Sequence, residues 1–179
     1  MATITKRAIA AAFLEIAQEK PIDKVTVKDV VNRCGITRQT FYYHFQDLLD
    51  VVEWLVAQKM EALLAETLAA ETPQAAIRVL LSVAEGEQLN FLERLLHSRK
   101  REEAERIFYN AARTYFAKLM RQSPHTPTLK YAGDMDVALT FYSSAFVGVL
   151  LEASSKPDVD LDLLAEQLLR FLNGEAHPK

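Results

Sequence analysis

The sequence VKDVVNRCGITRQTFYYHF, from Val27 to Phe45, decides the fold of this chain. Four apolar residues in its first half fall at i, i+3, i+4 and i+7, the spacing of one buried helix face: Val27, Val30, Val31 and Cys34. Thr26 precedes that helix and Asp29 stands three residues later, a pattern typical of a capped helix start. Gly35 supplies the permissive backbone that ends a helix, and Thr37 is placed to cap the next one. The stretch therefore predicts two short helices joined by a tight turn.

The second of these helices, predicted from Arg38 to Phe45, has an apolar side and a polar side. At about 100° per residue, Phe41 and Phe45 share the inner side, while Gln39 and Tyr43 lie opposite. The flanks carry four more polar residues: Arg38, Thr40, Tyr42 and His44. Such donor-rich side chains suit base edges and phosphate oxygens. A helix, a short turn with Gly and a polar second helix make the helix-turn-helix arrangement, so the sequence predicts binding to DNA.

The run GITRQTFYYHFQDLLDVV, from Gly35 to Val52, together with the amphipathic helix before it, resembles the TetR family of bacterial transcription regulators. The resemblance covers roughly the first 55 residues. It implies a three-helix DNA-binding domain, a helical C-terminal domain that dimerises and usually binds a small effector, and operators with two-fold symmetry. The family commonly has a Lys that reaches a DNA phosphate at the position of Leu48, and a Leu cannot do so. Gln46, Lys28 or Lys24 could take up part of that electrostatic role.

The form Tyr-Tyr-His-Phe at the end of the second helix is similar to a subset of the family that includes an activator of dihydroxyacetone kinase genes. That resemblance implies control by a protein partner in place of a small ligand. Two functions are therefore expected. The first is a regulator of transcription that is released from its operator by a small apolar or aromatic effector. Repression is the commoner outcome in the family, so a repressor is expected. The alternative is a TetR-like regulator or co-activator switched by contact with a partner protein.

Each polar residue of the helix-turn-helix has an expected role on double-stranded operator DNA. Arg38 and Gln39 are the better candidates for base edges, because each can donate two hydrogen bonds. Tyr43 is expected to pack against a thymine methyl group or a sugar, while Thr26 and Lys28 anchor the neighbouring DNA backbone. Tyr42, Thr40 and His44 are expected to hold phosphates. The whole predicted set is Thr26, Lys28, Thr37, Arg38, Gln39, Thr40, Tyr42, Tyr43 and His44.

The composition favours an all-α protein. The affinity for DNA is expected to depend on how charge is distributed along the chain. The 179 residues are 50% hydrophobic with 5 Gly and 6 Pro, and strand-like alternation is hard to find. A net charge of -3 would ordinarily argue against a nucleic-acid partner. Residues 1–50, however, carry seven Lys/Arg against six Asp/Glu, whereas residues 51–179 carry fourteen against eighteen. We therefore expect modest non-specific affinity with a strong dependence on salt.

The sequence offers no signature of an enzyme, a membrane protein or a secreted protein. A single Cys excludes an internal disulfide and fits a reducing compartment, with Cys34 expected in the core. No apolar run approaches the ~18 residues needed to cross a membrane, and no signal peptide opens the chain, so a cytoplasmic location is expected. Catalytic motifs such as G-x-S-x-G and HExxH are missing, and the four His are scattered. Neither catalysis, a metal nor a cofactor is expected.

Apolar periodicity predicts about nine helices in two domains. Residues 1–47 are expected to form the helix-turn-helix domain, with the motif itself at about 27–45, and residues 48–179 a helical effector-binding and dimerisation domain. Seven helices are predicted besides the two of the motif: 5–19, 48–70, 74–84, 89–96, 102–122, 134–154 and 161–173. The helix 48–70 is the expected link between the domains. The segment HSRKR, 97–101, fits a solvated turn better than a nucleic-acid patch.

Two surfaces of the C-terminal domain are expected to carry function. The last two predicted helices are long and apolar, which favours a four-helix homodimer interface, although both could simply be core. Aromatic residues with a few polar groups are the usual lining of a small-molecule site, and they could equally fill a core. The candidate ligand-binding set is Phe108, Tyr109, Tyr115, Phe141, Tyr142 and Phe146.

Overall fold

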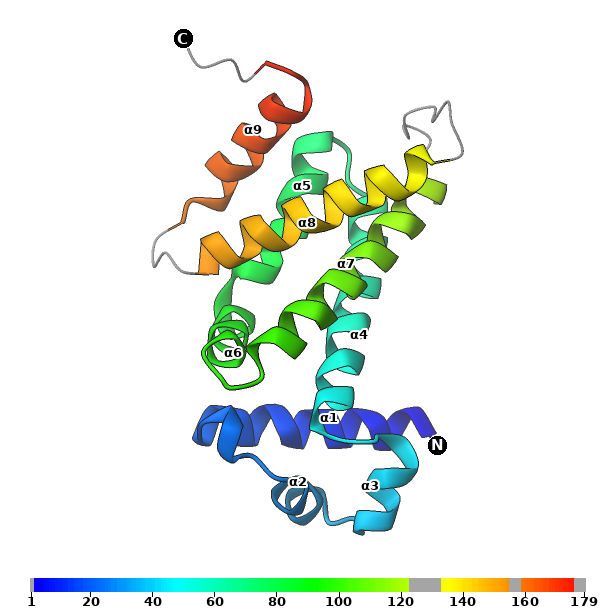
Figure 1. Ribbon diagram of the computed structural model, residues 1–179, viewed down its shortest axis with the longest axis vertical. Helices are drawn as coiled ribbons and strands as arrows, with labels where there is room; N and C mark the ends of the chain where they lie inside the picture. Colours follow the sequence, from blue (N-terminus) through cyan, green and yellow to red (C-terminus); the bar gives the residue numbers. More distant parts are fainter. Residues whose placement is uncertain (1, 123–132, 155–158, 176–179) are drawn as a thin grey trace. The chain divides into compact units, whose positions relative to one another are not determined.

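In the computed structural model, which describes residues 2–122, 133–154 and 159–175, all regular structure is helical (Figure 1). The described residues form nine α-helices and two 3-10 turns. Their bounds are α1 Ala2–Glu19, η1 Ile22–Lys24, α2 Val27–Cys34, α3 Arg38–His44, α4 Leu48–Leu68, α5 Pro73–Leu81, η2 Ser82–Ala84, α6 Gly86–Leu96, α7 Arg101–Gln122, α8 Asp134–Ser154 and α9 Leu161–Leu172. The predicted all-α fold is confirmed.

Most predicted boundaries lie within a few residues of the observed ones. The predicted limits of α2 and α8 are correct, whereas α1 begins at Ala2, three residues before the predicted Thr5. The predicted helix 74–84 is α5 followed by the separate turn η2. The predicted helix 89–96 starts earlier than expected, because Gly86 is the first residue of α6. The connections between the predicted helices 102–122, 134–154 and 161–173 fall largely outside the described residues.

The chain divides into two compact units that are not consecutive in sequence. Unit 1 comprises Met1–Gln58 and Asn90–Phe108, and unit 2 comprises Lys59–Leu89 and Tyr109–Lys179. The chain therefore passes between the units three times, and each passage falls inside a helix, namely α4, α6 and α7. The domain boundary expected between residues 47 and 48 stays a prediction.

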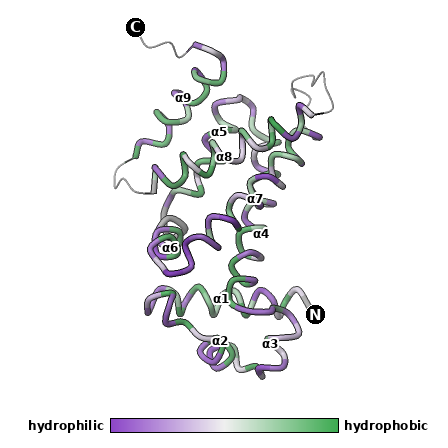
Figure 2. Tube along the Cα trace, viewed as in Figure 1, coloured by the Kyte–Doolittle hydropathy of each residue, from purple (hydrophilic) through white to green (hydrophobic). Residues whose placement is uncertain are grey.

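Unit 1 is organised around α1, which packs against α2 and α3. Its apolar residues recur at helical spacing, as the hydropathy along α1 in Figure 2 shows, and Ile9, Phe13 and Ile16 are buried. The second segment of unit 1 is attached to the C-terminal end of this helix. The Phe91 ring meets the Phe13 ring edge-on, with centroids 6.0 Å apart.

Arg94 of α6 caps the end of α1. Its Nη1 donates to the carbonyl oxygen of Gln18 (3.0 Å) and its Nη2 to that of Lys20 (2.9 Å). The last carbonyls of a helix lack partners within the helix, so a guanidinium is a suitable cap. Nearby, the backbone N–H of Arg99 donates to both carboxylate oxygens of Asp23 (3.1 and 3.2 Å). These contacts explain why residues 90–108 belong to unit 1.

Unit 2 contains α5, η2, α8 and α9 with parts of α4, α6 and α7. Helix α5 packs against α9, and Arg78 joins them through an ion pair to Asp162 (2.9 Å). Inside the unit, the buried Tyr115 hydroxyl donates to Thr67 Oγ1 (2.7 Å). Burial raises the pKa of Tyr115 despite that hydrogen bond.

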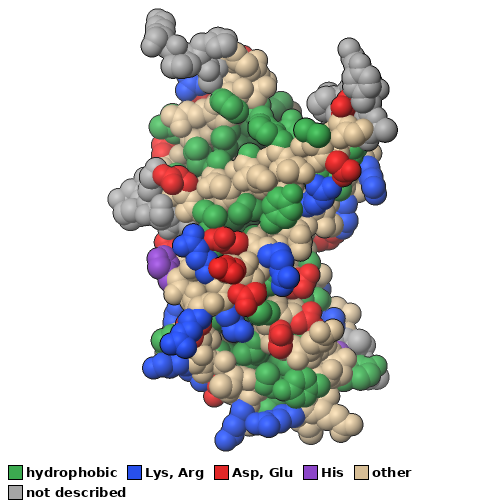
Figure 3. Space-filling view, in the orientation of Figure 1, with side chains coloured by type: hydrophobic (Ala, Val, Ile, Leu, Met, Phe, Trp, Pro, Cys, Tyr) green, Lys and Arg blue, Asp and Glu red, His purple; other side chains and the backbone are tan. Residues whose placement is uncertain are grey.

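Helix α8 leaves an apolar face uncovered. Val137 and Phe141 are 70% and 53% exposed, and hydrophobic side chains gather over α8 and beside α9 in Figure 3. Across Asp134–Ala153 the mean hydropathy is 1.3, which makes α8 long and apolar enough to cross a membrane by length and composition. The expectation that no apolar run approaches that length was therefore wrong for α8. Core helices of soluble proteins pass the same test, so the finding is weak support for a membrane segment.

Candidate nucleic-acid interface

Helix α2 begins with the predicted cap. The N–H of Asp29 donates to Thr26 Oγ1 (3.2 Å), and the N–H of Thr26 donates to Asp29 Oδ2 (2.8 Å), which completes a capping box. The Thr26 hydroxyl also donates to Asp29 Oδ2 (2.6 Å). Both donors of Thr26 are therefore engaged within the protein. A phosphate contact through its hydroxyl requires the hydrogen to turn away from Asp29.

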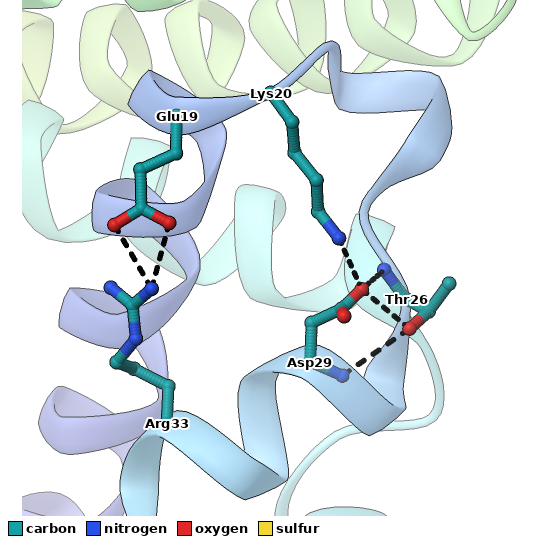
Figure 4. A network of polar contacts seen from close by, with 5 residues as sticks. All are labelled: Glu19, Lys20, Thr26, Asp29 and Arg33. Carbon is teal, nitrogen blue, oxygen red and sulfur yellow. Dashed lines mark hydrogen bonds and ion pairs between the residues drawn. The ribbon is translucent and has the colours of Figure 1, made fainter.

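A network of ion pairs joins the end of α1 to α2 (Figure 4). Lys20 Nζ lies 2.6 Å from Asp29 Oδ2, and these hydrogen bonds from Lys20 and Thr26 lower the pKa of Asp29 to about 2. Arg33 contacts Glu19 (2.7 Å) and Glu15 (3.1 Å), and its hydrogen bond lowers the pKa of Glu19. The network fixes α2 on α1 and so fixes the position of the motif.

Beside this network lies a hollow of about 440 Å³. It is lined by Ile16, Glu19, Lys20, Asp29, Asn32 and Arg33. Because Lys20 and Arg33 are paired with carboxylates, the hollow offers an anion little net positive charge. The sequence reasoning missed this network. The available signal was the i, i+4 pair of acids on α1, Glu15 and Glu19, which places two carboxylates on one helix face.

The turn between α2 and α3 depends on Gly35. Its φ of 67° lies in the left-handed region, and its N–H donates to the carbonyl oxygens of Val31 and Asn32. Thr37 then caps α3, because its Oγ1 accepts from the N–H of Thr40 (3.1 Å). The hydroxyls of Thr37 and Thr40 lie 2.9 Å apart, so they share one hydrogen bond and one hydroxyl hydrogen stays available to a ligand.

Helix α3 has the two sides that the helical wheel predicts. Phe41 and Phe45 are 0% and 2% exposed, and Phe45, the last predicted helical residue, is the extended C-cap. The polar residues face outward. Arg38, Gln39, Tyr42 and Tyr43 are exposed, and Thr40 and His44 are half-buried. Thr26, Lys28 and Thr37 are exposed as well, so solvent reaches all nine predicted DNA-binding residues.

Aromatic contacts hold α3 in place. The Phe45 ring lies between the rings of Phe41 and Trp54, with centroids 6.1 and 6.2 Å away. Trp54 belongs to α4, so it links the end of α3 to the following helix. Leu48, at the start of α4, is half-buried. Cys34 was predicted to be core but is only half-buried, because it is the last residue of α2, where its thiol donates to the carbonyl oxygen of Ala8 (3.5 Å).

Ion pairing changes the charge that unit 1 offers to DNA. Of the seven Lys and Arg in residues 1–50, Lys20 and Arg33 are paired with carboxylates. Within the part of the chain that the structure describes, no ion pair involves the other five, which are Lys6, Arg7, Lys24, Lys28 and Arg38. Three of the six acids, Glu15, Glu19 and Asp29, are neutralised by the same pairs. The nearly even count of charges therefore understates the positive charge available to phosphates.

The predicted ligand-binding residues differ in exposure. Phe108, Tyr115 and Phe146 are buried, Tyr109 and Tyr142 are half-buried, and Phe141 is exposed on α8. In unit 2 the Phe116 ring, which was not in the predicted set, contacts the rings of Tyr115, Tyr142 and Phe146 at 5.2 to 6.1 Å. Their role as a binding site stays a prediction. Among the described residues, no three His, Cys, Asp or Glu side chains are grouped so that they could hold a metal ion.

Comparison with known proteins places the helix-turn-helix in a family. Residues 7–51 match the family described as "Bacterial regulatory proteins, tetR family". The curated "HTH-type dhaKLM operon transcriptional activator DhaS" of Lactococcus lactis subsp. lactis (strain IL1403) is 35% identical over 52 residues. Those residues are 29% of this chain and 28% of that protein, so the relation concerns the N-terminal part.

Solved structures share the fold across nearly the whole chain. A "Dihydroxyacetone kinase operon activator DhaS" has a TM-score of 0.64 at 21% identity, covering 97% of this chain and 96% of that one. A TetR-family transcriptional regulator from Pectobacterium atrosepticum has a TM-score of 0.61 at 19% identity, with 99% and 97% covered. The TetR family repressor AlkX from Dietzia sp. strain DQ12-45-1b has a TM-score of 0.57 at 15% identity, with 94% and 93% covered. The helix-turn-helix of this chain is therefore similar to that of the TetR family of bacterial regulatory proteins.

Proposed function

We propose that this protein is a sequence-specific DNA-binding regulator of transcription, which inserts α3 into the major groove. The observation that carries the proposal is the orientation of α3, which buries Phe41 and Phe45 and exposes Arg38, Gln39 and Tyr43. A major groove about 12 Å wide admits one α-helix. Arg38 and Gln39 read base edges and Tyr43 packs on a thymine methyl group or sugar.

Phosphates are held by residues around the reading helix. Tyr42, Thr40 and His44 contact the DNA backbone from α3, while Thr26 and Lys28 do so from the start of α2. Thr37 and Thr40 supply the hydroxyl hydrogen that their mutual bond leaves available. These contacts fix the register of the protein on the duplex, and the base contacts select the sequence.

We further propose a homodimer formed through α8 and α9, which matches an operator of two-fold symmetry. Five large apolar side chains of these helices are 47% to 70% exposed: Val137, Phe141, Leu163, Phe171 and Leu172. Large apolar side chains left exposed in this number are typical of a protein interface. Apart from the backbone of α8 itself and the residues next to Gly148 in the chain, no atom lies within 4 Å of the Cβ position at Gly148, which leaves room for a partner helix. Three acids, Asp134, Asp136 and Glu152, lie within the apolar span of α8, which favours such an interface in a cytoplasmic protein over a membrane segment.

The proposed switch is a small apolar or aromatic effector bound in unit 2, which releases the protein as a repressor. The aromatic cluster around Phe116 and the paired hydroxyls of Tyr115 and Thr67 support this proposal. The second candidate is a regulator switched by a partner protein without a small ligand. The similarity of residues in the helix-turn-helix domain to the activator DhaS supports that alternative.

The test is selection of a binding sequence by the purified full-length protein from a pool of random duplexes. A palindromic consensus with half-sites about one helical turn apart is expected. Arg38→Ala is expected to cost roughly 1 to 3 kcal/mol of binding free energy and to relax specificity at one base pair per half-site. Arg106→Ala, an exposed position on α7, serves as the control. Failure to enrich any sequence contradicts the proposed function, and unchanged specificity removes Arg38 from base reading.

The sign of regulation needs a separate measurement. A reporter gene placed behind the selected operator shows repression or activation directly when the protein is supplied. Response of the purified protein to a panel of aromatic compounds, measured as release of the operator, favours the effector. Release only by a co-purifying protein favours the second candidate.

A further inference from the structure

The side chain of Lys6 lies at the C-terminal end of the proposed reading helix. Its Nζ is 5.0 Å from the centroid of the Phe45 ring, and Phe45 is the C-cap of α3. Lys6 comes from the first turns of α1, so this contact brings together two segments 39 residues apart in sequence. We propose that Lys6 is a DNA-contacting residue, which binds a backbone phosphate beside the end of α3. The inference rests on the proposed function and adds to it a residue that the motif does not contain.

The stretch of sequence that contains the end of α3 and follows it has no Lys or Arg of its own to offer a phosphate. Between Arg38 and Lys59 there is no Lys or Arg, whereas Asp47, Asp50 and Glu53 lie in this stretch. Asp50 accepts the N–H of Gln46 (2.9 Å), and Asp47 accepts the N–H of Asp50 (3.0 Å), so both carboxylates are held at the connection from α3 to α4. The C-terminal end of a helix also carries partial negative charge. Without a cation from elsewhere, this end of α3 would repel the DNA backbone.

The two ends of α3 therefore differ in charge. Arg38 lies at its start, and Lys28 lies one helix earlier. At its end, residues 39–58 supply no Lys or Arg, and Lys6 reaches this end through its contact with Phe45. A helix of 7 residues is about 10 Å long, slightly shorter than the width of the major groove, so phosphates lie within reach of both its ends. Lys6 supplies at the second end the charge that Arg38 and Lys28 supply at the first.

The contact with Phe45 positions the ammonium group without neutralising it. A cation lies over the face of an aromatic ring through the ring's quadrupole, and the N–H groups directed away from the ring remain able to donate. Phe45 itself is fixed between Phe41 and Trp54. In the described residues Lys6 takes part in no ion pair, in contrast to Lys20, which lies 2.6 Å from Asp29. Lys6 is thus held in place, and its ammonium group stays accessible to a DNA phosphate.

The experiment measures how the affinity of the full-length protein for DNA depends on salt. The probes are the duplex that the wild-type protein selects from the random pool and a duplex of scrambled sequence. Lys6→Met keeps the apolar part of the side chain over Phe45 and removes the charge, and Lys6→Arg keeps the charge. Lys59→Met removes the same charge from α4 at the other end of the stretch without cations. Lys6→Gln is a second neutral variant, so that the result does not depend on the folding of one protein.

Loss of one phosphate contact lowers the slope of log K against log salt by about 0.9 for each protomer. We expect this decrease for Lys6→Met and Lys6→Gln, equal weakening on selected and scrambled duplexes, and the wild-type slope for Lys6→Arg and Lys59→Met. A slope of log K against log salt that stays at the wild-type value in both neutral variants overturns the inference. If the melting temperature of those variants is also lower than that of the wild type, the role of Lys6 is only to cover Phe45. A wild-type protein that selects no duplex overturns the proposed function itself, and this inference with it.

Discussion

At the scale of single residues, Gly35 sets the angle between α2 and α3 because its φ of 67° belongs to the left-handed region. We predict that Gly35→Ala lowers the free energy of unfolding by roughly 1 to 2 kcal/mol, the cost of that conformation for an L-residue. Beyond Gly35 and its two chain neighbours, no atom lies within 4 Å of the added Cβ, so the loss comes from the backbone conformation. Urea denaturation measures it.

The control for Gly35 is Gly133→Ala, since that position is also open but does not have a left-handed φ. Its free energy of unfolding should change by less than about 0.5 kcal/mol. Equal effects at the two positions would contradict the assignment of the cost to the Gly35 backbone.

Asp29 makes the stability of unit 1 depend on pH. Hydrogen bonds from Lys20 and Thr26 lower its pKa from 3.8 to about 2. Because the folded pKa lies below the usual value, the stabilisation is complete above pH 4 and is lost as the pH falls towards 2. We predict that Asp29→Asn is less stable than the wild type at pH 7 and that the difference narrows below pH 4, as measured by urea midpoints across this range.

Lys20→Met should show part of the pH dependence lost in Asp29→Asn, since it removes the largest cause of the lowered pKa of Asp29 and leaves the hydrogen bonds from Thr26. A difference between the wild type and Asp29→Asn that is constant from pH 7 to pH 3 would refute the role of this ionisation.

At the scale of elements, the sequence predicts most helices correctly because their apolar positions repeat with the helical period. Helix α3 is the clearest case, since the inward pair Phe41 and Phe45 follows from spacing alone. Long-range partners are different. Nothing in the local pattern indicates that Arg94 caps α1 or that Lys6 lies on Phe45, because such contacts depend on the path of the chain between them.

The same limit applies to burial near helix ends. Cys34 has the spacing of a core residue, but at the last position of α2 it is only half covered. Phe141 was expected to line a ligand-binding site yet is 53% exposed. A helix that is apolar on all sides does not indicate which of its faces is covered by the rest of the protein. Exposure on such helices is decided by tertiary packing and is not encoded in their period.

Arg94 tests the attachment of α6 to α1. We predict that Arg94→Ala lowers the free energy of unfolding by about 1 to 3 kcal/mol, since it removes two charged hydrogen bonds to carbonyl oxygens, one of them partly buried. Hydrogen exchange should accelerate at the C-terminal end of α1. Arg106→Ala, exposed on the following helix, is the matched control. Identical exchange in the Arg94 variant and the wild type would rule out the capping role.

At the scale of the whole molecule, the exposed apolar face of α8 leads us to predict where two copies of the chain meet. We predict that Val137→Ser combined with Phe141→Ser converts the proposed dimer to a monomer in analytical ultracentrifugation and weakens operator binding, because each protomer loses two apolar side chains from the proposed interface. The variant should keep its helical content. Its control is Leu68→Ser, which removes an exposed apolar side chain (39%) from α4. A double variant that remains dimeric would place the interface elsewhere.

The three passages of the chain between the two units, each inside α4, α6 or α7, restrict how such a regulator can be recombined. A hybrid gene made with a single crossover after Gln58 would inherit the DNA-reading motif from one parent and the Phe91 and Arg94 that support it from the other. Such hybrid proteins should retain the DNA specificity of one parent only when residues 1–58 and residues 90–108 both come from that parent.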